Sequence, residues 1–335
     1  MSRTVNWGVL STAKIGVKNV IPSMQKGELS RIVALASRDG ERAKAAADAL
    51  GIERSYGSYE ELLADPAIDA IYNPLPNHLH VPWTVRALEA GKHVLCEKPL
   101  ALTADEAQQL AEASARSGRL VAEAFMVRHH PQWQTARRLV AEGRIGEARA
   151  IQTTFAYYLT DPTNIRNQAD IGGGGLYDIG CYAINTARYI FGGEPDRVTG
   201  LFDMDPSLGT DRMMSGLAAF SDNRHLSFLC ATQLVPCQRV QILGTKARLE
   251  IAIPFNAPND VPAQIVIDDG SDLRGSGRQL LELPLADQYT LQGDAFSRAI
   301  LGQEPVTWGL DDSVRNMRVI DAFFRSGRTG NWERP

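Results

Sequence analysis

Cysteine is scarce in this sequence, and the few cysteines present do not cluster. The 335 residues include four of them, Cys96, Cys181, Cys230 and Cys237, and no two form a Cys-x-x-Cys pair. Such spacing favours reduced thiols and argues against a disulfide framework or a cysteine zinc site. The histidine pairs at 78/80 and 129/130 also lack the i,i+4 spacing of ligands on one helix face. We therefore expect no metal ion.

Basic clusters and long apolar runs are also missing. Lys and Arg number 35 against 39 Asp and Glu, and no basic run could follow a phosphate backbone, so we expect no nucleic-acid partner. No apolar run reaches the ~18–20 residues that cross a bilayer, so we expect no membrane insertion. The first seven residues lead directly into a strand-like stretch without the apolar core of a signal peptide, which predicts a cytoplasmic protein.

The composition that remains is typical of a globular protein, with 44% hydrophobic and 22% charged residues. At roughly 100–200 residues per domain, the length predicts two domains. Residues 1–125 alternate short apolar runs with amphipathic stretches. We expect strands at 5–10, 32–37, 70–73, 93–96 and 120–124, and helices that include 42–50, 81–90 and 104–117. This alternation predicts a parallel, doubly wound Rossmann sheet.

The pattern changes in residues 126–335. A helix is expected from Pro131 to Glu142, and a long helix from Gly175 to Phe191. Strands dominate elsewhere, at 148–158, 196–202, 216–220, 226–232, 240–243, 248–253 and 264–267, and two helices, at 291–301 and 312–326, close the chain. Short turns between consecutive strands favour a large, mostly antiparallel open sheet in an α+β domain.

The turn after the first strand occupies the place of a dinucleotide-binding glycine motif. It reads Ser11-Thr12-Ala13-Lys14-Ile15-Gly16, so only the last glycine of G-x-G-x-x-G is present. Small residues at the other two positions still permit a tight turn, and a pyrophosphate could approach the helix N-terminus. The alternative is an ordinary strand-to-helix turn.

The second strand ends at Ser37-Arg38-Asp39, where NAD-binding enzymes usually carry an acidic residue for the ribose 2′-hydroxyl. Serine and arginine suit a 2′-phosphate better, which favours NADP(H). Alternatively, Arg38 is a solvated surface residue that Asp39 partly neutralises.

Three further segments carry polar residues where ligands could bind. The stretches from Asn73 to His80 and from Glu97 to Pro99 follow two buried strands, at the sheet edge where open α/β folds bind ligands. Four glycines at 172–175 precede a helix on which Asp178 and Tyr182 share one face. Each segment taken alone could be only a turn or a flexible helix entry.

Taken in order, these motifs resemble the Gfo/Idh/MocA oxidoreductase family. The resemblance is carried by residues 8–16, 56–62, 91–100, 122–128 and 173–182, and it spans nearly the whole chain. At position 182 this chain has tyrosine, where inositol-dehydrogenase-like members place histidine. In this respect it resembles the branch of glucose-fructose oxidoreductase, dimeric dihydrodiol dehydrogenase and NADP-dependent xylose or aldose dehydrogenases.

The resemblance implies that Lys98, Asp178 and Tyr182 are catalytic. A tyrosine with an ordinary pKa of about 10 is a poor base at neutral pH, but a neighbouring ammonium favours its phenolate form. Tyr182 would exchange the hydroxyl proton while hydride moves to or from the nicotinamide, Lys98 would supply positive charge, and Asp178 would orient the substrate.

The resemblance also implies which residues bind NADP(H): Ser11, Thr12, Ala13, Ile15, Ser37, Arg38, Pro74, Leu75, Asn77, His80, Glu97, Lys98, Arg128 and Arg166. It further implies a homodimer or homotetramer formed through the open sheet. We expect alternating apolar positions such as Leu226, Phe228 and Cys230 to form the face that a second copy covers.

The expected activity is hydride transfer between NADP(H) and a hydroxyl or carbonyl group of a sugar or polyol, with C1 of an aldose such as xylose or glucose as the first choice. Other readings stay open: a sugar–sugar oxidoreductase with tightly bound NADP(H), a trans-dihydrodiol dehydrogenase, or a catalytically silent NADP-binding regulator.

Overall fold

The structure, a computed structural model, describes residues 3–335, and the chain divides into two compact units. Met1 and Ser2, which begin the predicted first domain, lie outside the described residues. The first unit extends to Met126 and also contains Asp287–Val314; the second comprises Val127–Ala286 and Arg315–Pro335. The boundary predicted between residues 125 and 126 differs from this division mainly in the late segment that joins the first unit.

The first unit contains a six-stranded parallel sheet, which confirms the predicted doubly wound architecture. Its strands lie in the order β3 (Arg54–Tyr56), β2 (Ser30–Ala36), β1 (Val5–Leu10), β4 (Ala70–Asn73), β5 (His93–Cys96) and β6 (Val121–Glu123). The strand order reverses between β1 and β4, and ligands of such sheets bind beyond the carboxyl ends of the strands at this point. The short edge strand β3 was not predicted, because its three residues show no apolar alternation.

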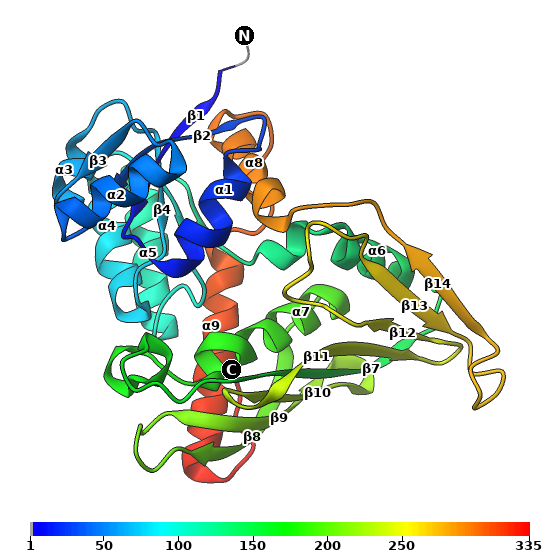
Figure 1. The fold of residues 1–335 in the computed structure, drawn as a ribbon. Coiled ribbons are helices and arrows are strands. Elements are labelled where there is room, and N and C mark those ends of the chain that lie inside the picture. The colour runs from blue at the N-terminus through cyan, green and yellow to red at the C-terminus, as the bar shows by residue number, and fades with distance from the viewer. Residues whose placement is uncertain (1–2) are drawn as a thin grey trace. The chain divides into compact units, whose positions relative to one another are not determined.

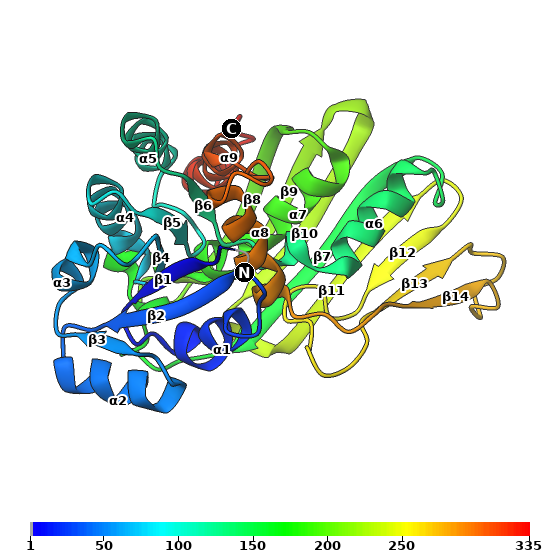
Figure 2. The same cartoon turned by 90° about the horizontal axis from the view of Figure 1, so that it is seen from above.

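Helices lie on both faces of this sheet (Figure 2). They include α1 (Ile21–Met24), α2 (Gly40–Leu50), α3 (Tyr59–Ala64), α4 (His80–Glu89) and α5 (Ala104–Ser117). The bounds of α5 match the prediction because both ends have strong local signals. Thr103 accepts the N–H of Glu106 at 3.2 Å, and Gly118 ends the helix at a φ of 66°.

The late segment of the first unit carries α8 (Gln288–Ile300), which completes the core beneath β1. The fully buried ring of Trp7 packs against Phe296 with 5.9 Å between centroids, and Trp7 Nε1 donates to Ser297 Oγ at 3.2 Å. At the start of α8, Ser23 Oγ donates to Asp287 Oδ2 at 2.6 Å. Periodicity alone could not reveal that this helix returns to the first core.

The second unit is built on an eight-stranded sheet that is mostly antiparallel, as predicted. Its order is β14 (Arg278–Glu282), β13 (Gln264–Asp268), β12 (Arg248–Ile251), β11 (Gln233–Gly244), β7 (Ala148–Tyr158), β10 (Arg224–Ala231), β9 (Asp211–Phe220) and β8 (Pro195–Met204). The central strands β7 and β10 run parallel to each other. The edge strand β14 was not predicted.

Helices α6 (Pro131–Ala141), α7 (Cys181–Phe191) and the later part of α9 (Leu310–Thr329) accompany this sheet (Figure 1). Leu226, Phe228 and Cys230 are only 1%, 4% and 1% exposed, and Phe228 packs edge-on against Phe323 of α9 at 5.2 Å. The expectation that these three residues form an open face is therefore wrong. Their side of the sheet is the core of the unit itself.

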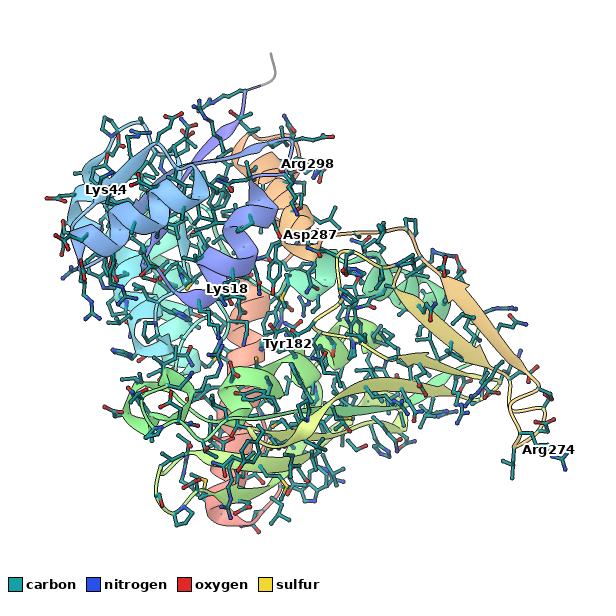
Figure 3. The ribbon with its side chains drawn as sticks, viewed as in Figure 1. Lys18, Lys44, Tyr182, Arg274, Asp287 and Arg298 are labelled. Atoms are coloured by element: carbon teal, nitrogen blue, oxygen red, sulfur yellow. The ribbon has the colours of Figure 1, made fainter. Side chains whose placement is uncertain are left out.

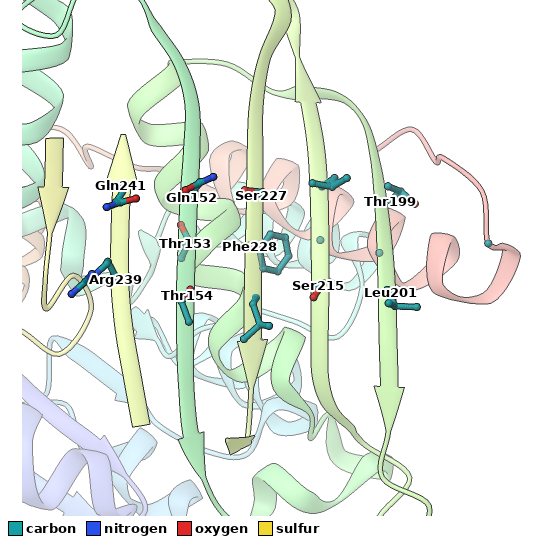
Figure 4. A pocket seen from close by; sticks show the side chains of 15 residues that line it. Gln152, Thr153, Thr154, Thr199, Leu201, Ser215, Ser227, Phe228, Arg239 and Gln241 are labelled. Carbon is teal, nitrogen blue, oxygen red and sulfur yellow. The ribbon is translucent and has the colours of Figure 1, made fainter. Parts of the chain in front are cut away.

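The opposite side of the sheet carries two rows of side chains that cross the strands (Figure 4). One row contains Gln241, Gln152, Ser227, Leu217 and Thr199, and the other contains Arg239, Thr154, Leu229, Ser215 and Leu201. Together they line a hollow of about 780 Å³. This is the open face of the second unit.

Across residues 3–335, every helix falls short of the length and apolarity that a membrane span requires.

Candidate active site

The turn after β1 adopts the backbone conformation that favours glycine, although a serine stands there. Ser11 has a φ of 71°, and its Oγ accepts the N–H of Ala13 at 3.2 Å. The chain then enters η1 (Gly16–Val20), the π-helical turn that precedes α1. The N–H groups at such a helix start lack intrahelical partners and can bind an anion.

At the end of β2, Ser37, Arg38 and Asp39 have distinct surroundings. Asp39 caps α2 by accepting the N–H of Arg42 at 3.1 Å, and Ser37 Oγ accepts the N–H of Asp39 at 3.2 Å. Burial raises the pKa of Tyr59, and the hydrogen-bonded guanidinium of Arg38 opposes that shift. Arg38 thus lies against Tyr59, while the carboxylate of Asp39 is engaged at the helix start.

The loops after β4 and β5 are joined by His80. Its Nδ1 lies 2.8 Å from the carbonyl oxygen of Pro99, and its Nε2 lies 2.7 Å from that of Leu75. The ring is 1% exposed. Asn73 Nδ2 adds a bond to the His80 carbonyl at 3.2 Å. Of the predicted cofactor residues, His80 is therefore placed to hold the two loops together.

Glu97 is held by a buried tyrosine that the sequence did not single out. Tyr72 Oη donates to Glu97 Oε1 at 2.7 Å, and the Lys98 N–H donates to Glu97 Oε2 at 3.3 Å. Burial and the adjacent carboxylate of Glu97 raise the pKa of Tyr72 well above its ordinary value, so Tyr72 is a stable donor. The Lys98–Pro99 peptide bond is cis. These contacts fix the backbone that carries Lys98.

In the second unit, Asp178 lies on η6 (Leu176–Gly180), a π-helical turn that leads into α7. Its Oδ2 accepts hydrogen bonds from Tyr157 Oη at 2.6 Å and from Arg166 Nε at 3.0 Å. Burial and the charge of Asp178 raise the pKa of Tyr157. The structure thus joins two predicted residues, Asp178 and Arg166, to a third, Tyr157, that the sequence analysis missed.

Tyr182 begins α7 together with Cys181 and is labelled in Figure 3. Its ring is 5% exposed and packs against Phe255 and Phe155, with centroids 5.2 and 5.9 Å away. Asp178 on η6 and Tyr182 on α7 are four residues apart, within the region 175–191 that the sequence analysis predicted as one helix.

Arg128 is buried and binds α7. Its Nε donates to Asn185 Oδ1 at 2.7 Å, and a terminal nitrogen donates to the Asn185 carbonyl at 3.2 Å. The sequence analysis assigned Arg128 to the cofactor. In the structure its guanidinium supports the helix that carries Tyr182.

The glycines at 172–175 allow other backbone and side-chain atoms of the protein to approach the loop closely. A Cβ at Gly173 would lie 2.7 Å from the carbonyl oxygens of Arg166 and Gln168, and one at Gly174 would lie 1.9 Å from Asp211 Oδ1. Larger residues would therefore displace the start of η6. No sequence signal identified Asp211, because it lies 35 residues from its partner Leu176.

The predicted site residues fall into two groups. The first unit holds those at the ends of β1, β2, β4 and β5, including Lys98; the second unit holds Arg128, Arg166, Asp178 and Tyr182. In the first unit, the contacts described above connect His80 with Leu75 and with the loop that carries Glu97 and Lys98. In the second unit, they connect Asp178 with Arg166.

Comparison with known proteins identifies the family. A model described as an oxidoreductase family with an NAD-binding Rossmann fold matches residues 5–125, and a model of the GFO/IDH/MocA C-terminal domain matches residues 133–250. The two matches cover most of the chain. The chain therefore belongs to the Gfo/Idh/MocA oxidoreductase family, and its first unit is the family's NAD-binding Rossmann domain.

Individual relatives match over almost their whole length. An uncharacterized oxidoreductase of Rhizobium meliloti is 48% identical over 329 residues, 98% of each chain. The D-xylose 1-dehydrogenase (NADP(+)) 2 of Haloferax volcanii is 38% identical over 326 residues, 97% of this chain and 98% of the relative. A crystal structure of a 3-ketoreductase from Actinomadura kijaniata with NADP and TDP-benzene matches with a TM-score of 0.90, 30% identity and 97% and 98% coverage.

Proposed function

We propose that this protein is an NADP(H)-dependent oxidoreductase that transfers hydride between the nicotinamide and a sugar or polyol, most directly at C1 of an aldose. The observation that carries the proposal is the helical segment on which Asp178, held by Tyr157 and Arg166, precedes Tyr182 by one turn. The 38% identity to a D-xylose 1-dehydrogenase that uses NADP⁺ supports the choice of substrate class.

The residues of the first unit fit NADP(H). The turn at Ser11 to Gly16 leads a strand into a helix start, which suits a pyrophosphate. At the end of β2, Asp39 is engaged in capping α2, so its carboxylate is held away from the role of ribose ligand, and Arg38 supplies the positive charge. When bound, the cofactor supplies a hydride acceptor or donor at the nicotinamide.

The residues proposed to hold the cofactor are Ser11, Thr12, Ala13, Ile15, Ser37, Arg38, Pro74, Leu75, Asn77, Glu97, Lys98 and Arg166. His80 and Arg128 act in this proposal by fixing the loops and the helix that they contact.

Each of the three proposed catalytic residues has a separate role. Tyr182 takes or returns the proton of the reacting hydroxyl. Lys98 supplies an ammonium that favours the tyrosinate. Asp178, whose carboxylate is fixed by two donors, orients the substrate.

A spectrophotometric screen of aldoses, polyols and diols with NADP⁺ tests this function. We expect NADPH formation with an aldose, at a rate that falls in a Tyr182→Phe variant. Turnover only with a trans-dihydrodiol would replace the substrate class, and no turnover with intact NADP⁺ binding would favour a silent regulator. Cofactor that survives desalting would favour a sugar–sugar oxidoreductase.

Keto-sugar reduction is a second candidate, favoured by the structural match to the 3-ketoreductase. NADPH consumption with a 3-keto nucleotide sugar, in the absence of aldose oxidation, would select it.

We also propose that the protein forms a homodimer or homotetramer through the open face of the second unit. The exposed leucines of that face, Leu201 and Leu217, support this arrangement.

A further inference from the structure

Asp211 is a buried carboxylate at the start of β9 that the proposed reaction does not yet use. It is 3% exposed. Its Oδ2 accepts the N–H of Leu176, the first residue of η6, at 2.6 Å. The backbone N–H groups of Gly175 and of Asp211 itself also bind this carboxylate. A residue from a strand thus caps the start of a helical segment that lies 35 positions earlier in the chain.

The glycine loop is shaped around this carboxylate. Gly174 has a φ of 117°, and a Cβ there would lie 1.9 Å from Asp211 Oδ1. A Cβ at Gly175 would lie 3.2 Å from the Asp211 carbonyl oxygen. Asp211 can pack against the loop because Gly174 and Gly175 lack side chains. The glycines and the carboxylate therefore depend on one another.

This contact lies at the start of the helical segment. Asp178 follows Leu176 by two residues, and Tyr182 follows it by six. We propose that Asp211 is a positioning residue: its ionised carboxylate anchors the start of the segment that presents Asp178 and Tyr182, and protonation of Asp211 weakens the anchor. The consequence for turnover rests on the proposed function, whereas the anchor itself does not.

The surroundings of Asp211 set its proton affinity near neutral pH. Burial raises its pKa to about 7, the N–H groups of Leu176, Asp211 and Gly175 oppose this shift, and the charge of Asp178 on η6 adds to it. The other titratable neighbours are Cys230 on β10 and, beside it, Cys181 on α7.

The nearest arginine in sequence, Arg212, does not neutralise Asp211. Its guanidinium binds the half-exposed carboxylate of Asp203 on β8, with Nε donating at 3.0 Å. Asp205, which follows β8, accepts a hydrogen bond on its Oδ2 from Gln233 Nε2 at 2.7 Å.

Protonation changes the anchor because a neutral carboxyl group accepts hydrogen bonds more weakly and gives up one acceptor position to its own proton. The folded-state pKa lies above the ordinary carboxyl value of about 3.9, so the folded chain binds this proton more tightly than the unfolded chain. Burial and hydrogen bonding therefore act in opposite directions. The contribution of Asp211 to global stability is greatest at acid pH and falls as the pH rises through about 7, because ionisation leaves a charge in a buried place. The hydrogen bonds to η6 strengthen over the same interval, because the ionised carboxylate is the better acceptor. The proposed activity rises over the same interval. A purely structural residue would move both in the same direction.

The first test compares wild type, Asp211→Asn and the matched control Asp203→Asn. Asparagine keeps an acceptor for the Leu176 N–H but cannot ionise. In wild type we expect kcat to rise with an inflection near pH 7 while KM changes little. Asp211→Asn should lose this inflection and about tenfold in kcat at alkaline pH, the size of one charge-assisted bond. Asp203→Asn should keep both.

A second test needs no substrate. Hydrogen exchange of the amides at 174–182, corrected for intrinsic rates, should show greater protection above about pH 7 than below it in wild type and in Asp203→Asn. In Asp211→Asn this protection should be independent of pH. Gly174→Ala should reduce it, and the Gly174→Ala/Asp211→Ala pair should lose less than the sum of the single losses.

The outcomes separate the two proposals. If the amides at 174–182 showed the pH-dependent protection but no sugar were turned over, the anchor would stand and the proposed function would fall. A pH-dependent protection of residues 174–182 that survives in Asp211→Asn would overturn the anchor, whatever the substrate.

Discussion

The carboxylate of Asp178 is fixed by two hydrogen-bond donors. Tyr157 and Arg166 both donate to its Oδ2, and donors of this kind stabilise the ionised carboxylate. Burial and the charge of Asp178 raise the pKa of Tyr157, so this phenol stays protonated and continues to donate. Within the proposed function, the proton transfer therefore falls to Tyr182, and Asp178 keeps a fixed orientation toward the substrate.

The catalytic assignment predicts a coupled loss. Tyr182→Phe removes only the hydroxyl and should lower kcat by about 10²–10⁴-fold, the usual range for a positioned acid or base, while NADP(H) binding stays close to normal. Lys98→Met should cost a similar factor and shift the pH dependence of oxidation upward, because in the proposed function the Lys98 ammonium favours the phenolate. The double variant should lose no more than the larger single loss, since the two residues act as one unit.

Steady-state kinetics on the best aldose would measure these effects, with Tyr158→Phe as the control because Tyr158 is 67% exposed. If Tyr182→Phe turned over at nearly the wild-type rate, the base would lie elsewhere.

The proposed preference for NADP(H) rests on single residues. We predict that the protein binds NADP⁺ more tightly than NAD⁺ and that Arg38→Ala weakens NADP⁺ about 10–100-fold, because a charged hydrogen bond to the 2′-phosphate is lost. Binding of NAD⁺ should hardly change. Fluorescence titration of both cofactors measures this, and Arg31→Ala, an exposed arginine of β2 that pairs with Glu53, serves as control. An unchanged preference in Arg38→Ala would contradict the prediction.

At the scale of elements, helix bounds were predicted accurately where local sequence signals mark both ends. Helix α5 was predicted with its observed bounds because Thr103 and Gly118 mark its ends within a few residues. The segment from 175 to 191 was predicted as one helix, but it consists of the π-helical turn η6 followed by α7. Asp211 binds the start of η6 from a distant strand, and no local pattern reports such a contact.

The same limit applies to the candidate site. The predicted residues Asp178, Tyr182 and Lys98 lie at the ends of strands or on a helix, where sequence motifs mark them. Tyr157 and Tyr72 lie within strands β7 and β4, and their alternation with neighbours gave no sign that each donates to a carboxylate.

The packing of β9 against β10 gives a stability prediction. Gly216 lies opposite Phe228, and a Cβ at Gly216 would lie 2.3 Å from the Phe228 ring. Gly216→Ala should destabilise the protein by about 1–3 kcal/mol, the usual cost of overpacking a core. Urea unfolding followed by circular dichroism measures this. Gly193→Ala, which meets nothing within 4 Å, is the control and should change stability little. Equal midpoints for both variants would show that the ring moves aside freely.

At the scale of the whole molecule, the sequence analysis predicted that the buried face of the large sheet would be its open face. Alternation identified Leu226, Phe228 and Cys230 as one face, but it could not say that α7 and α9 of the same chain cover that face. The open face is instead mixed: hydroxyl and amide groups such as Ser227 and Gln152 separate a few leucines (Figure 4). A mixed composition of this kind is also typical of interfaces between preformed, folded copies.

The last prediction follows from that face. If two copies pack through it, a stable dimer buries about 800 Å² on each, and a charge placed among the leucines is buried without a partner. We expect light scattering to give a dimer or tetramer at micromolar concentration, and Leu217→Arg to shift it to the monomer. Leu217 is 48% exposed on the open face. Leu273, at the tip between β13 and β14 and fully exposed, provides the control, because Leu273→Arg lies outside the face and should leave the assembly intact. A wild-type monomer would refute the interface, and so would an assembly that Leu273→Arg disrupts as strongly as Leu217→Arg.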